Sequence, residues 1–501
     1  MIPLTTERGV REFGPSRAPE LRRSLVNRAR PVIALRATRF PGRGATVRRR
    51  CGADRSVLLR DCRVGPNAQL PIRSAVPEQI DRTPSLSDMG VPKGASGRVR
   101  MLRTSLVTLR VLVAITSGFG HIRPSAPIAN AAVARGHEVR YVVSSREQLM
   151  GGNPRGSGAL APAEFTTGLG FMTDVVVPAD TTPLLDRLPA PESDAAAMFR
   201  RFFVRAAAAV PFIRTLTEEW QPDVILRDTA GQDAWAVAEL TATPLATFDF
   251  APAQSGMLQA VAASEIAWFR HEIGLPPDPG LERMEGELRI VGAPPSWFDG
   301  HSVPANTHFV QPVEPDPMPG ESLAAVLNGR DERPLVYVTF GTAFNTPDLF
   351  QEVFDALADL EVQAIATIGL NNDNADLSVP GNVRTVPFLS QGLILQHADL
   401  VVAHGGYGSL MGALRRGLPV LSLPLAPPDN RFNAARLVQL GAGIALEQEE
   451  RTAVAIRQSV QRLLDEREYR ERAGEIGEEI ASLPSVDHAA ELLERLAVPA
   501  D

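Results

Sequence analysis

Residues 399–440 read DLVVAHGGYGSLMGALRRGLPVLSLPLAPPDNRFNAARLVQL. This stretch opens on an apolar, valine-rich run that predicts a buried strand, and the run breaks at His404 into a glycine-rich turn. The next residues predict a helix that opens at 408 or 409, with Gly417 as its C-cap, and then a second strand over 420–425. Strand, turn, helix and strand in this order are typical of a doubly wound α/β domain.

The glycine turn has the composition of a phosphate-binding site. Gly405, Gly406 and Gly408 let the backbone bring bare N–H groups close to a ligand, and the following helix directs its positive dipole end to the same place. A glycine pair alone is more often only a tight connection. Here, however, Asp429 and Asn430 stand at the head of the next helix, again beyond the end of a strand, where open parallel sheets bind ligands. We expect a valine at either of the first two glycines to block the phosphate and to leave the fold intact.

The whole stretch resembles the donor-sugar signature of family 1 glycosyltransferases, the UDP-glycosyltransferase superfamily, in its bacterial form for natural products such as macrolides. That signature is roughly HGGxGT, then GxP, then DQxxNAxR before a glycine. The matching positions are His404, Gly405, Gly406, Gly408, Ser409, Gly417, Pro419, Asp429, Asn433, Ala434, Arg436 and Gly441. Ser409 replaces the usual threonine and keeps the hydroxyl, and Asn430 replaces the usual glutamine and keeps the amide on a shorter arm.

The resemblance implies the GT-B fold, an α/β architecture in which two Rossmann-like doubly wound domains face each other across a cleft. It also implies the residues that bind the donor. Those that would contact the donor diphosphate are Gly341, Thr342, His404, Gly405, Gly406, Gly408 and Ser409. Asp429 and Asn430 would contact the donor sugar. Phe388 and Gln391 would contact the nucleoside, although Ser390 replaces the proline usual there and Phe388 fits equally well as a core residue.

A second pattern lies upstream. Residues 106–115 predict a strand, and the glycine-containing loop over 116–125 brings His121 to the end of that strand. Residues 223–227 predict another strand, which ends at Asp228. Because the carboxyl ends of parallel strands meet at one edge of a sheet, we expect the two side chains at the same edge.

The resemblance implies that His121, in its GHxxP context, is the catalytic base and that Asp228 orients it and stabilises the imidazolium. For an isolated histidine in such a loop, a polar partner of the helix end is the alternative interpretation. We expect the positive start of the helix to keep the His121 ring neutral at pH 7. Asp233, five residues after Asp228, falls inside a helix, where we expect it to be solvated or capping.

Length and composition indicate several domains. The 501 residues exceed one hydrophobic core, the 44% hydrophobic content is ordinary for a globular protein, and no apolar run suggests stable membrane insertion. A proline-rich acidic connection separates two βα series. We predict an N-terminal acceptor-binding domain over 106–312, a linker over 313–322 and a C-terminal nucleotide-sugar-binding domain over 323–501. In GT-B proteins the last helix packs back on the N-terminal domain.

The first hundred residues differ from the rest. They carry 21 Lys and Arg against 8 Asp and Glu, whereas the remainder carries 30 against 50, and such an acidic body argues against nucleic acid as a partner. Both cysteines, Cys51 and Cys62, lie here, so the rest of the chain needs no disulfides, which suits the cytoplasm. We interpret residues 1–105 as a disordered basic extension or as a stretch translated from an early start, with Met101 as the alternative start. A targeting segment or a basic arm is the competing interpretation.

These residues predict an inverting glycosyltransferase that moves a hexose from a UDP- or TDP-sugar to a hydroxyl of a small, mostly apolar acceptor such as a polyketide, macrolide or aromatic aglycone. We expect no metal and no other cofactor, because hydroxyls and a helix dipole stand at the diphosphate site. The alternatives are a catalytically inactive GT-B auxiliary or binding protein and a GT-B sugar-nucleotide epimerase. The sequence leaves the sugar, the acceptor and the oligomeric state open.

Overall fold

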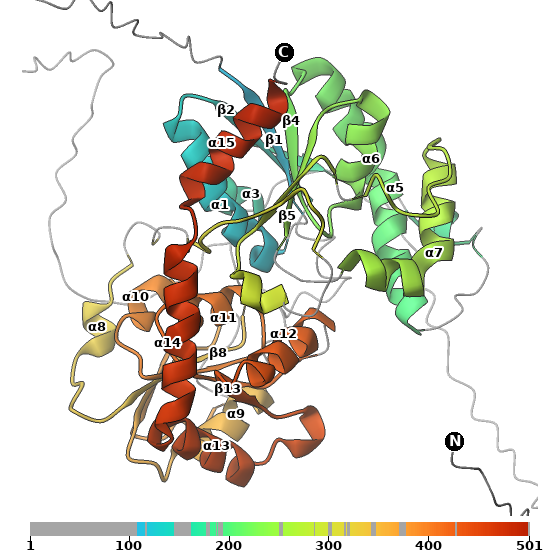
Figure 1. Ribbon diagram of the computed structural model, residues 1–501. Coiled ribbons are helices and arrows are strands. Elements are labelled where there is room, and N and C mark those ends of the chain that lie inside the picture. The colour runs from blue at the N-terminus through green and yellow to red at the C-terminus, as the bar shows by residue number, and fades with distance from the viewer. Residues whose placement is uncertain are drawn as a thin grey trace, which may run out of the picture. The chain divides into compact units, whose positions relative to one another are not determined.

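Two parallel β-sheets form the framework of the protein in a computed structural model (Figure 1). The structure describes residues 108–498 except for 116–117, 145–161, 177–180, 187, 189–193, 250–253, 285, 299–302, 315–316, 318–320, 342–346, 370–376 and 426–427. The described residues belong to one compact unit, Val99–Asp501. The predictions for residues 1–105 and for Thr342 therefore lie outside the described residues.

The first sheet has the strand order β3-β2-β1-β4-β5-β6-β7, and the second has the order β10-β9-β8-β11-β12-β13. Every pairing within both sheets is parallel. The strands of the first sheet are β1 (Arg110–Ala114), β2 (Glu138–Ser144), β3 (Met172–Val176), β4 (Val224–Asp228), β5 (Leu245–Asp249), β6 (Leu288–Val291) and β7 (Thr307–Phe309). Those of the second sheet are β8 (Leu335–Thr339), β9 (Gln363–Thr367), β10 (Val383–Val386), β11 (Leu400–Ala403), β12 (Val420–Ser422) and β13 (Gly443–Ala445).

Helices connect the strands, as parallel pairing requires. Those up to the start of the second sheet are α1 (Phe119–Ala134), α3 (Pro162–Gly168), α4 (Thr182–Leu185), α5 (Asp194–Trp220), α6 (Gln232–Thr241), α7 (Gln254–Glu272), η1 (Pro295–Phe298) and α8 (Ala324–Leu327). The later ones are α9 (Pro347–Leu357), α10 (Gln391–Leu395), α11 (Tyr407–Leu414), α12 (Pro428–Gln439), η3 (Gln448–Glu450), α13 (Ala453–Asp465), α14 (Arg467–Ser482) and α15 (Val486–Ala497).

The strand order reverses beside the first strand of each sheet. β1 lies between β2 and β4, and β8 lies between β9 and β11. Chain connections leave such a point in opposite directions, which opens space for a ligand at the carboxyl ends of the two central strands. His121 follows β1 and Asp228 ends β4, whereas Gly341 follows β8 and His404 follows β11. The predicted site residues therefore come from both reversal points.

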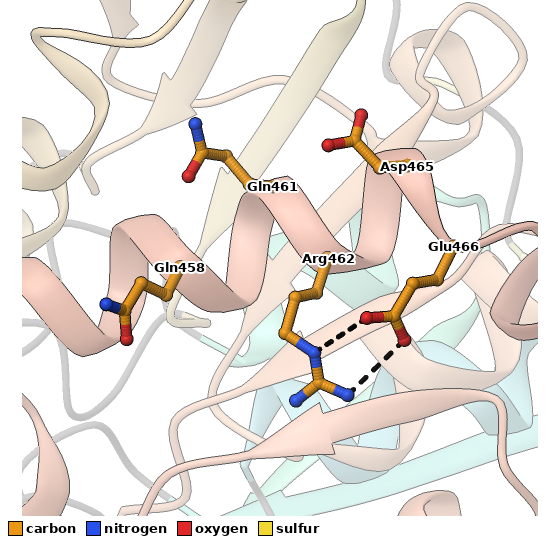
Figure 2. A pocket seen from close by; sticks show the side chains of 5 residues that line it. All are labelled: Gln458, Gln461, Arg462, Asp465 and Glu466. Atoms are coloured by element: carbon orange, nitrogen blue, oxygen red, sulfur yellow. Dashed lines mark hydrogen bonds and ion pairs between the residues drawn. The ribbon is translucent and has the colours of Figure 1, made fainter.

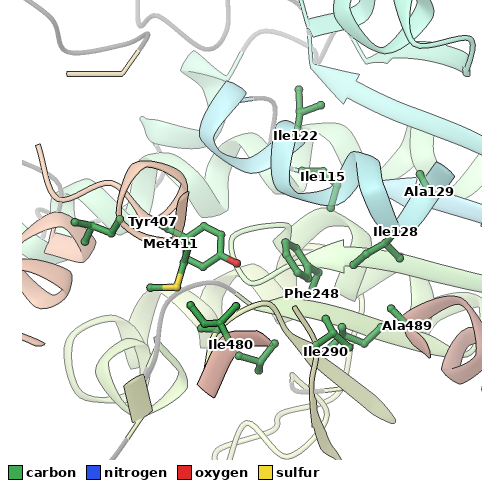
Figure 3. Packing of buried hydrophobic residues seen from close by; sticks show 14 of the residues in the cluster. Ile115, Ile122, Ile128, Ala129, Phe248, Ile290, Tyr407, Met411, Ile480 and Ala489 are labelled. Carbon is green, nitrogen blue, oxygen red and sulfur yellow. The ribbon is translucent and has the colours of Figure 1, made fainter. Parts of the chain in front are cut away.

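Apolar side chains bury the two sheets. All five residues of β4, of β5 and of β8 are buried, and most of them are apolar, although β4 and β5 each end on a buried aspartate. One core cluster contains residues from both sheets, and Figure 3 shows Tyr407 and Met411 of α11 beside Phe248 of β5. The Tyr407 hydroxyl donates a hydrogen bond to the carbonyl oxygen of Gly292, just after β6. The helix that follows the glycine turn is thus fastened to the first sheet.

The last helix contacts the first. α15 packs against α1, and the two lie alongside each other in Figure 1. Nε and Nη2 of Arg135 donate to Glu494 of α15 at 2.7 and 2.8 Å, and Nε2 of His137 lies 2.8 Å from the same carboxylate. The hydrogen bonds that Glu494 accepts lower its pKa to about 2, those from Arg135 more than the one from His137. A charged carboxylate therefore holds the C-terminal helix in place.

Some boundaries differ from the sequence-based predictions. α1 begins at Phe119, so His121 lies in the first turn of a helix and not in a loop. α11 begins at Tyr407, before the expected start at Gly408 or Ser409. The glycines at 118 and 406 occupy the N-cap positions with extended backbone angles, and this lets each helix open earlier than its apolar pattern indicates. The sequence did not predict β3, β6, β7 or β13.

Candidate active site

His121 and Asp228 form a hydrogen-bonded pair at the carboxyl edge of the first sheet. Nδ1 of His121 lies 2.5 Å from Oδ2 of Asp228. The aspartate side chain has no exposed surface, and the histidine side chain keeps 30%. When Nδ1 donates to the carboxylate, the neutral ring carries its lone pair on Nε2, which can accept a proton. The pair can therefore act as an oriented base, and its catalytic role stays a prediction.

The pKa of His121 departs from its ordinary value of 6.5 in the upward direction. Burial of the ring lowers the pKa, but the charge of Asp228 and the hydrogen bond to it raise it, and Asp429 adds to the rise. The start of α1 was expected to lower this pKa, whereas the shift is upward because the adjacent carboxylate has the stronger effect; a neutral ring at pH 7 stays a prediction. This arrangement stabilises the imidazolium that forms when the base takes a proton.

Asp233 is half-buried at the start of a helix, which agrees with the capping alternative of the sequence-based expectation. It lies in the first turn of α6, and its Oδ1 accepts a hydrogen bond from the backbone N–H of Ala234 at 2.9 Å. Burial raises the pKa of Asp233 to about 6, and the charge of Asp228 acts in the same direction. A second carboxyl group thus lies within electrostatic reach of the His121–Asp228 pair.

The turn after β11 is held by polar contacts with α12. Gly405 has a φ of +81°, and a Cβ added there would lie 2.6 Å from the carbonyl oxygen of Asn430. The side-chain amide of Asn433 donates to the carbonyl oxygen of Gly405 at 3.1 Å. A valine at Gly405 would therefore disturb the fold, so the expectation of an intact fold was wrong. By contrast, nothing lies within 4 Å of a Cβ added to Gly408.

The ring of His404 lies between two glycine turns. A Cβ added to Gly341 would lie 3.0 Å from Cε1 of His404, and one added to Gly406 would overlap the same ring. Burial lowers the pKa of His404 to about 4, so the imidazole is neutral at pH 7. Its predicted contact with a diphosphate would therefore be a hydrogen bond and not an ion pair. These two glycines are needed to admit the histidine ring, whatever else they bind.

Asp429 connects the two halves of the predicted site. It lies in the first turn of α12, where burial raises its pKa and His121 lowers it. His121 of the first sheet and Asp429 of the second therefore lie within electrostatic reach of each other. Asn430 is only 3% exposed, so Asp429 is the more accessible of the two predicted sugar-binding residues. Ser409 is half-buried in the first turn of α11.

The predicted nucleoside residues lie beside the glycine turn. Nε2 of Gln391 donates to the carbonyl oxygen of Gly408 at 2.7 Å. Phe388 is half-buried and belongs to none of the core clusters in the described part of the chain, which disfavours its interpretation as a core residue. The guanidinium of Arg123 lies over its ring at 5.6 Å. Sequence reasoning missed Arg123, although a charged residue directly before Pro124 at a helix start was visible.

Outside the predicted site, the described residues show fewer features that could bind a ligand. A shallow hollow on α13 is lined by Gln458, Gln461, Arg462, Asp465 and Glu466 (Figure 2). Its arginine donates to Glu466 at 2.9 Å, so the two charges satisfy each other. Among the residues with described positions, no group of three or more His, Cys, Asp or Glu side chains could hold a metal ion. Across the same residues, no helix is both long and apolar enough to cross a membrane.

Comparison with solved structures identifies the fold. The glycosyltransferase VinC in complex with DTDP has a TM-score of 0.62 and 21% sequence identity, and the match covers 78% of this chain and 99% of that chain. Identity this low shows a shared fold only. The two parallel-sheet domains and this likeness make the chain a protein of the GT-B fold.

Sequence relatives then indicate the class of enzyme. Residues 351–496 match the family model for "Erythromycin biosynthesis protein CIII-like, C-terminal domain". The chain is 28% identical to 4'-demethylrebeccamycin synthase of Lentzea aerocolonigenes, over 77% of this chain and 99% of the relative. It is 27% identical to demethyllactenocin mycarosyltransferase of Streptomyces fradiae, over 76% of this chain and 85% of the relative. The protein is a glycosyltransferase of the natural-product type, as its donor signature predicted.

Proposed function

We propose that the protein is an inverting hexosyltransferase that uses a UDP- or TDP-sugar and a hydroxyl-bearing, mostly apolar small molecule such as a polyketide, macrolide or aromatic aglycone. The observation that carries the proposal is the 2.5 Å contact between His121 and Asp228, with Asp429 of the other sheet in electrostatic reach of the same ring. The predicted base and a predicted sugar-binding residue thus come within electrostatic reach of each other from the two sheets. The DTDP complex of VinC and the mycarosyltransferase relative support a nucleotide-sugar donor.

The reaction is a single displacement. Nε2 of His121 takes the proton of the acceptor hydroxyl, and the acceptor oxygen forms a bond to the anomeric carbon of the sugar. The bond from that carbon to the phosphate oxygen breaks, and the nucleoside diphosphate leaves with the electron pair. Because the acceptor attacks from the face opposite the leaving group, the anomeric configuration inverts. Asp228 keeps the tautomer and balances the charge of the imidazolium.

The chain also offers a means of stabilising the departing diphosphate. The backbone N–H groups of residues 405–409 lie at the start of α11, and the dipole of that helix favours negative charge there. We therefore propose that transfer needs no metal ion and no organic cofactor. We also propose that the enzyme works in the cytoplasm. Activity should be unchanged by EDTA, and a loss restored by Mg²⁺ would refute the metal-independent part.

The experiment is a transfer assay. The protein is incubated with UDP- and TDP-hexoses of known anomeric configuration and a panel of hydroxyl-bearing aglycones, and the product linkage is determined by NMR. We expect a glycoside of inverted configuration that depends on His121. Retention of configuration would refute the mechanism. Hydrolysis or epimerisation of the donor without transfer would favour an epimerase, and no reaction with any pair would favour a non-catalytic GT-B protein.

A further inference from the structure

Arg123 carries a charged group that the proposed displacement does not use. It lies in α1, two residues after His121, and its side chain is half-buried. Its guanidinium carbon is 5.7 Å from the ring centre of Phe165 on α3 and 5.6 Å from that of Phe388, a residue of the second domain. The helix that carries the predicted base therefore also reaches the predicted nucleoside site.

The guanidinium has unused hydrogen-bonding capacity. Burial lowers the pKa of Arg123, while Glu321, Tyr337 and Glu314 act in the opposite direction, and an arginine side chain stays charged at pH 7 in any case. Within the described part of the chain, the Arg123 guanidinium makes cation–π contacts with these two rings and no hydrogen bond or ion pair. An arginine offers five N–H donors in a planar fork. Those donors are available to a ligand.

In each of two carboxylates near Arg123, one oxygen accepts a hydrogen bond and the other accepts none from the described residues. Oε2 of Glu321 accepts a hydrogen bond from the backbone N–H of Ser390 at 3.1 Å. Oε2 of Glu314 accepts one from Nη2 of Arg416 at 2.9 Å. The Oε1 atoms of both glutamates are buried and have no hydrogen-bond partner among the described residues. Buried polar atoms without partners are costly, so a ligand that supplies donors here is favoured.

Glu314 also lies next to the predicted ribose contact. A Cβ added to Gly412 of α11 would lie 2.5 Å from Oε1 of Glu314 and 2.8 Å from Nε2 of Gln391. The absence of a side chain at Gly412 therefore lets the linker carboxylate approach Gln391. Oε1 of Glu314, the side chain of Gln391 and the ring of Phe388 border the same region.

The charges of this cluster disfavour a phosphate as the partner of Arg123. Two guanidinium groups, Arg123 and Arg416, balance the carboxylates of Glu314 and Glu321, so the cluster has no net charge that would attract a diphosphate. It offers unused donors, unused acceptors and an aromatic face. A pyrimidine nucleoside is complementary, because its ring carbonyls accept hydrogen bonds, its ribose hydroxyls donate them and its base is planar.

We propose that Arg123 determines donor specificity by donating hydrogen bonds to a carbonyl oxygen of a pyrimidine base that lies against Phe388, while Glu314 and Glu321 accept from the ribose hydroxyls. This inference rests on the proposed function, since it assigns a residue to the nucleoside of that donor. Arg123 is thereby a binding residue contributed by the acceptor-side domain. A charge-assisted hydrogen bond of this kind changes affinity by about ten- to a hundredfold.

The experiment measures nucleotide affinity by isothermal titration calorimetry with UDP, UMP, ADP and inorganic pyrophosphate. Arg123→Met should weaken UDP and UMP by the same factor, about ten- to a hundredfold, and should leave pyrophosphate unchanged. Arg140→Met is the matched control, because Arg140 also lies over an aromatic ring, that of Trp220, at 5.6 Å and pairs with Asp174. The control should bind all four ligands like the wild type.

Several outcomes would overturn the inference. UDP affinity that stays unchanged in Arg123→Met would overturn it. A loss of affinity for UDP or pyrophosphate without a loss for UMP would also overturn it, because that pattern indicates a phosphate contact. If Arg123→Met does not fold, Arg123→Gln decides by the same comparison of UDP, UMP and pyrophosphate, and a wild-type protein that binds ADP as tightly as UDP would refute base recognition altogether. The wild type is also titrated with TDP, and a wild-type protein that binds neither UDP nor TDP would refute the proposed function itself, a result distinct from a failed Arg123 variant.

Discussion

Replacing Asp228 with asparagine removes the charge beside His121 and keeps the shape of the side chain. In the wild type, burial lowers the pKa of His121, and the charge and hydrogen bond of Asp228 raise it above 6.5. The base works in its neutral form, so activity falls as the pH drops below this raised pKa. An adjacent opposite charge shifts a pKa by about 1–3 units, so the acid limb of kcat/KM should move to lower pH by about that amount in Asp228→Asn.

The plateau of the pH profile gives the second part of this test. His121→Ala should lose about a hundred- to ten-thousandfold in turnover at little cost in donor affinity, which is the typical contribution of a general base. Asp228→Asn should lose somewhat less, because the wrong tautomer becomes available to the ring. The double variant should be scarcely worse than His121→Ala, because groups that act as a unit are not additive.

The assay is initial-rate kinetics with one hydroxyl acceptor from about pH 5 to 9, a window centred on the histidine range. Asp359→Asn is the control, because this aspartate is 73% exposed and pairs with Arg457 at the surface. Its profile should match the wild type. An acid limb that stays in place in Asp228→Asn, or additive losses in the double variant, would mean that Asp228 does not act through His121.

Three further predictions concern the fold and the donor turn. Gly408→Val should weaken donor binding more than tenfold with little change in Tm, since a Cβ at this position meets no protein atom. Gly405→Val should lower the Tm. Donor affinity equal to that of the wild type in Gly408→Val would remove this turn from the site. Glu494→Gln should cost about 1–3 kcal/mol at neutral pH. Because the pKa of Glu494 is depressed to about 2, its stabilisation is present above the ordinary value of 4.5 and is lost as the pH falls from there, so unfolding curves of variant and wild type should converge in acid. A chain that starts at Met101 should melt and bind UDP like the full chain, and a large drop in Tm would show that the preceding residues belong to the fold.

The local elements were largely predictable from the sequence, because each carries a periodic apolar pattern and recognisable ends. The apolar runs before His404 and Asp228 predicted β11 and β4, and the glycine turn marked the start of α11 to within two residues. The edge strand β3 escaped because its five residues, with Met172 exposed, show little of a core strand's pattern. Strands of similar length, such as β4 and β11, were predicted because they stand in clear apolar runs, which β3 does not.

By itself, the sequence determined the class of the protein: the signature over 399–440 and the alternation of strands and helices point to two doubly wound domains and to a sugar-nucleotide site. Only the tertiary structure decided which side chains meet. His121 and Asp228 are 107 residues apart and become a pair because β1 and β4 are neighbours in the sheet. The upward pKa of His121, the approach of Asp429 and the position of Arg123 over Phe388 depend on the same long-range packing. Electrostatic effects fall with distance through space and not along the chain, so no local pattern encodes them.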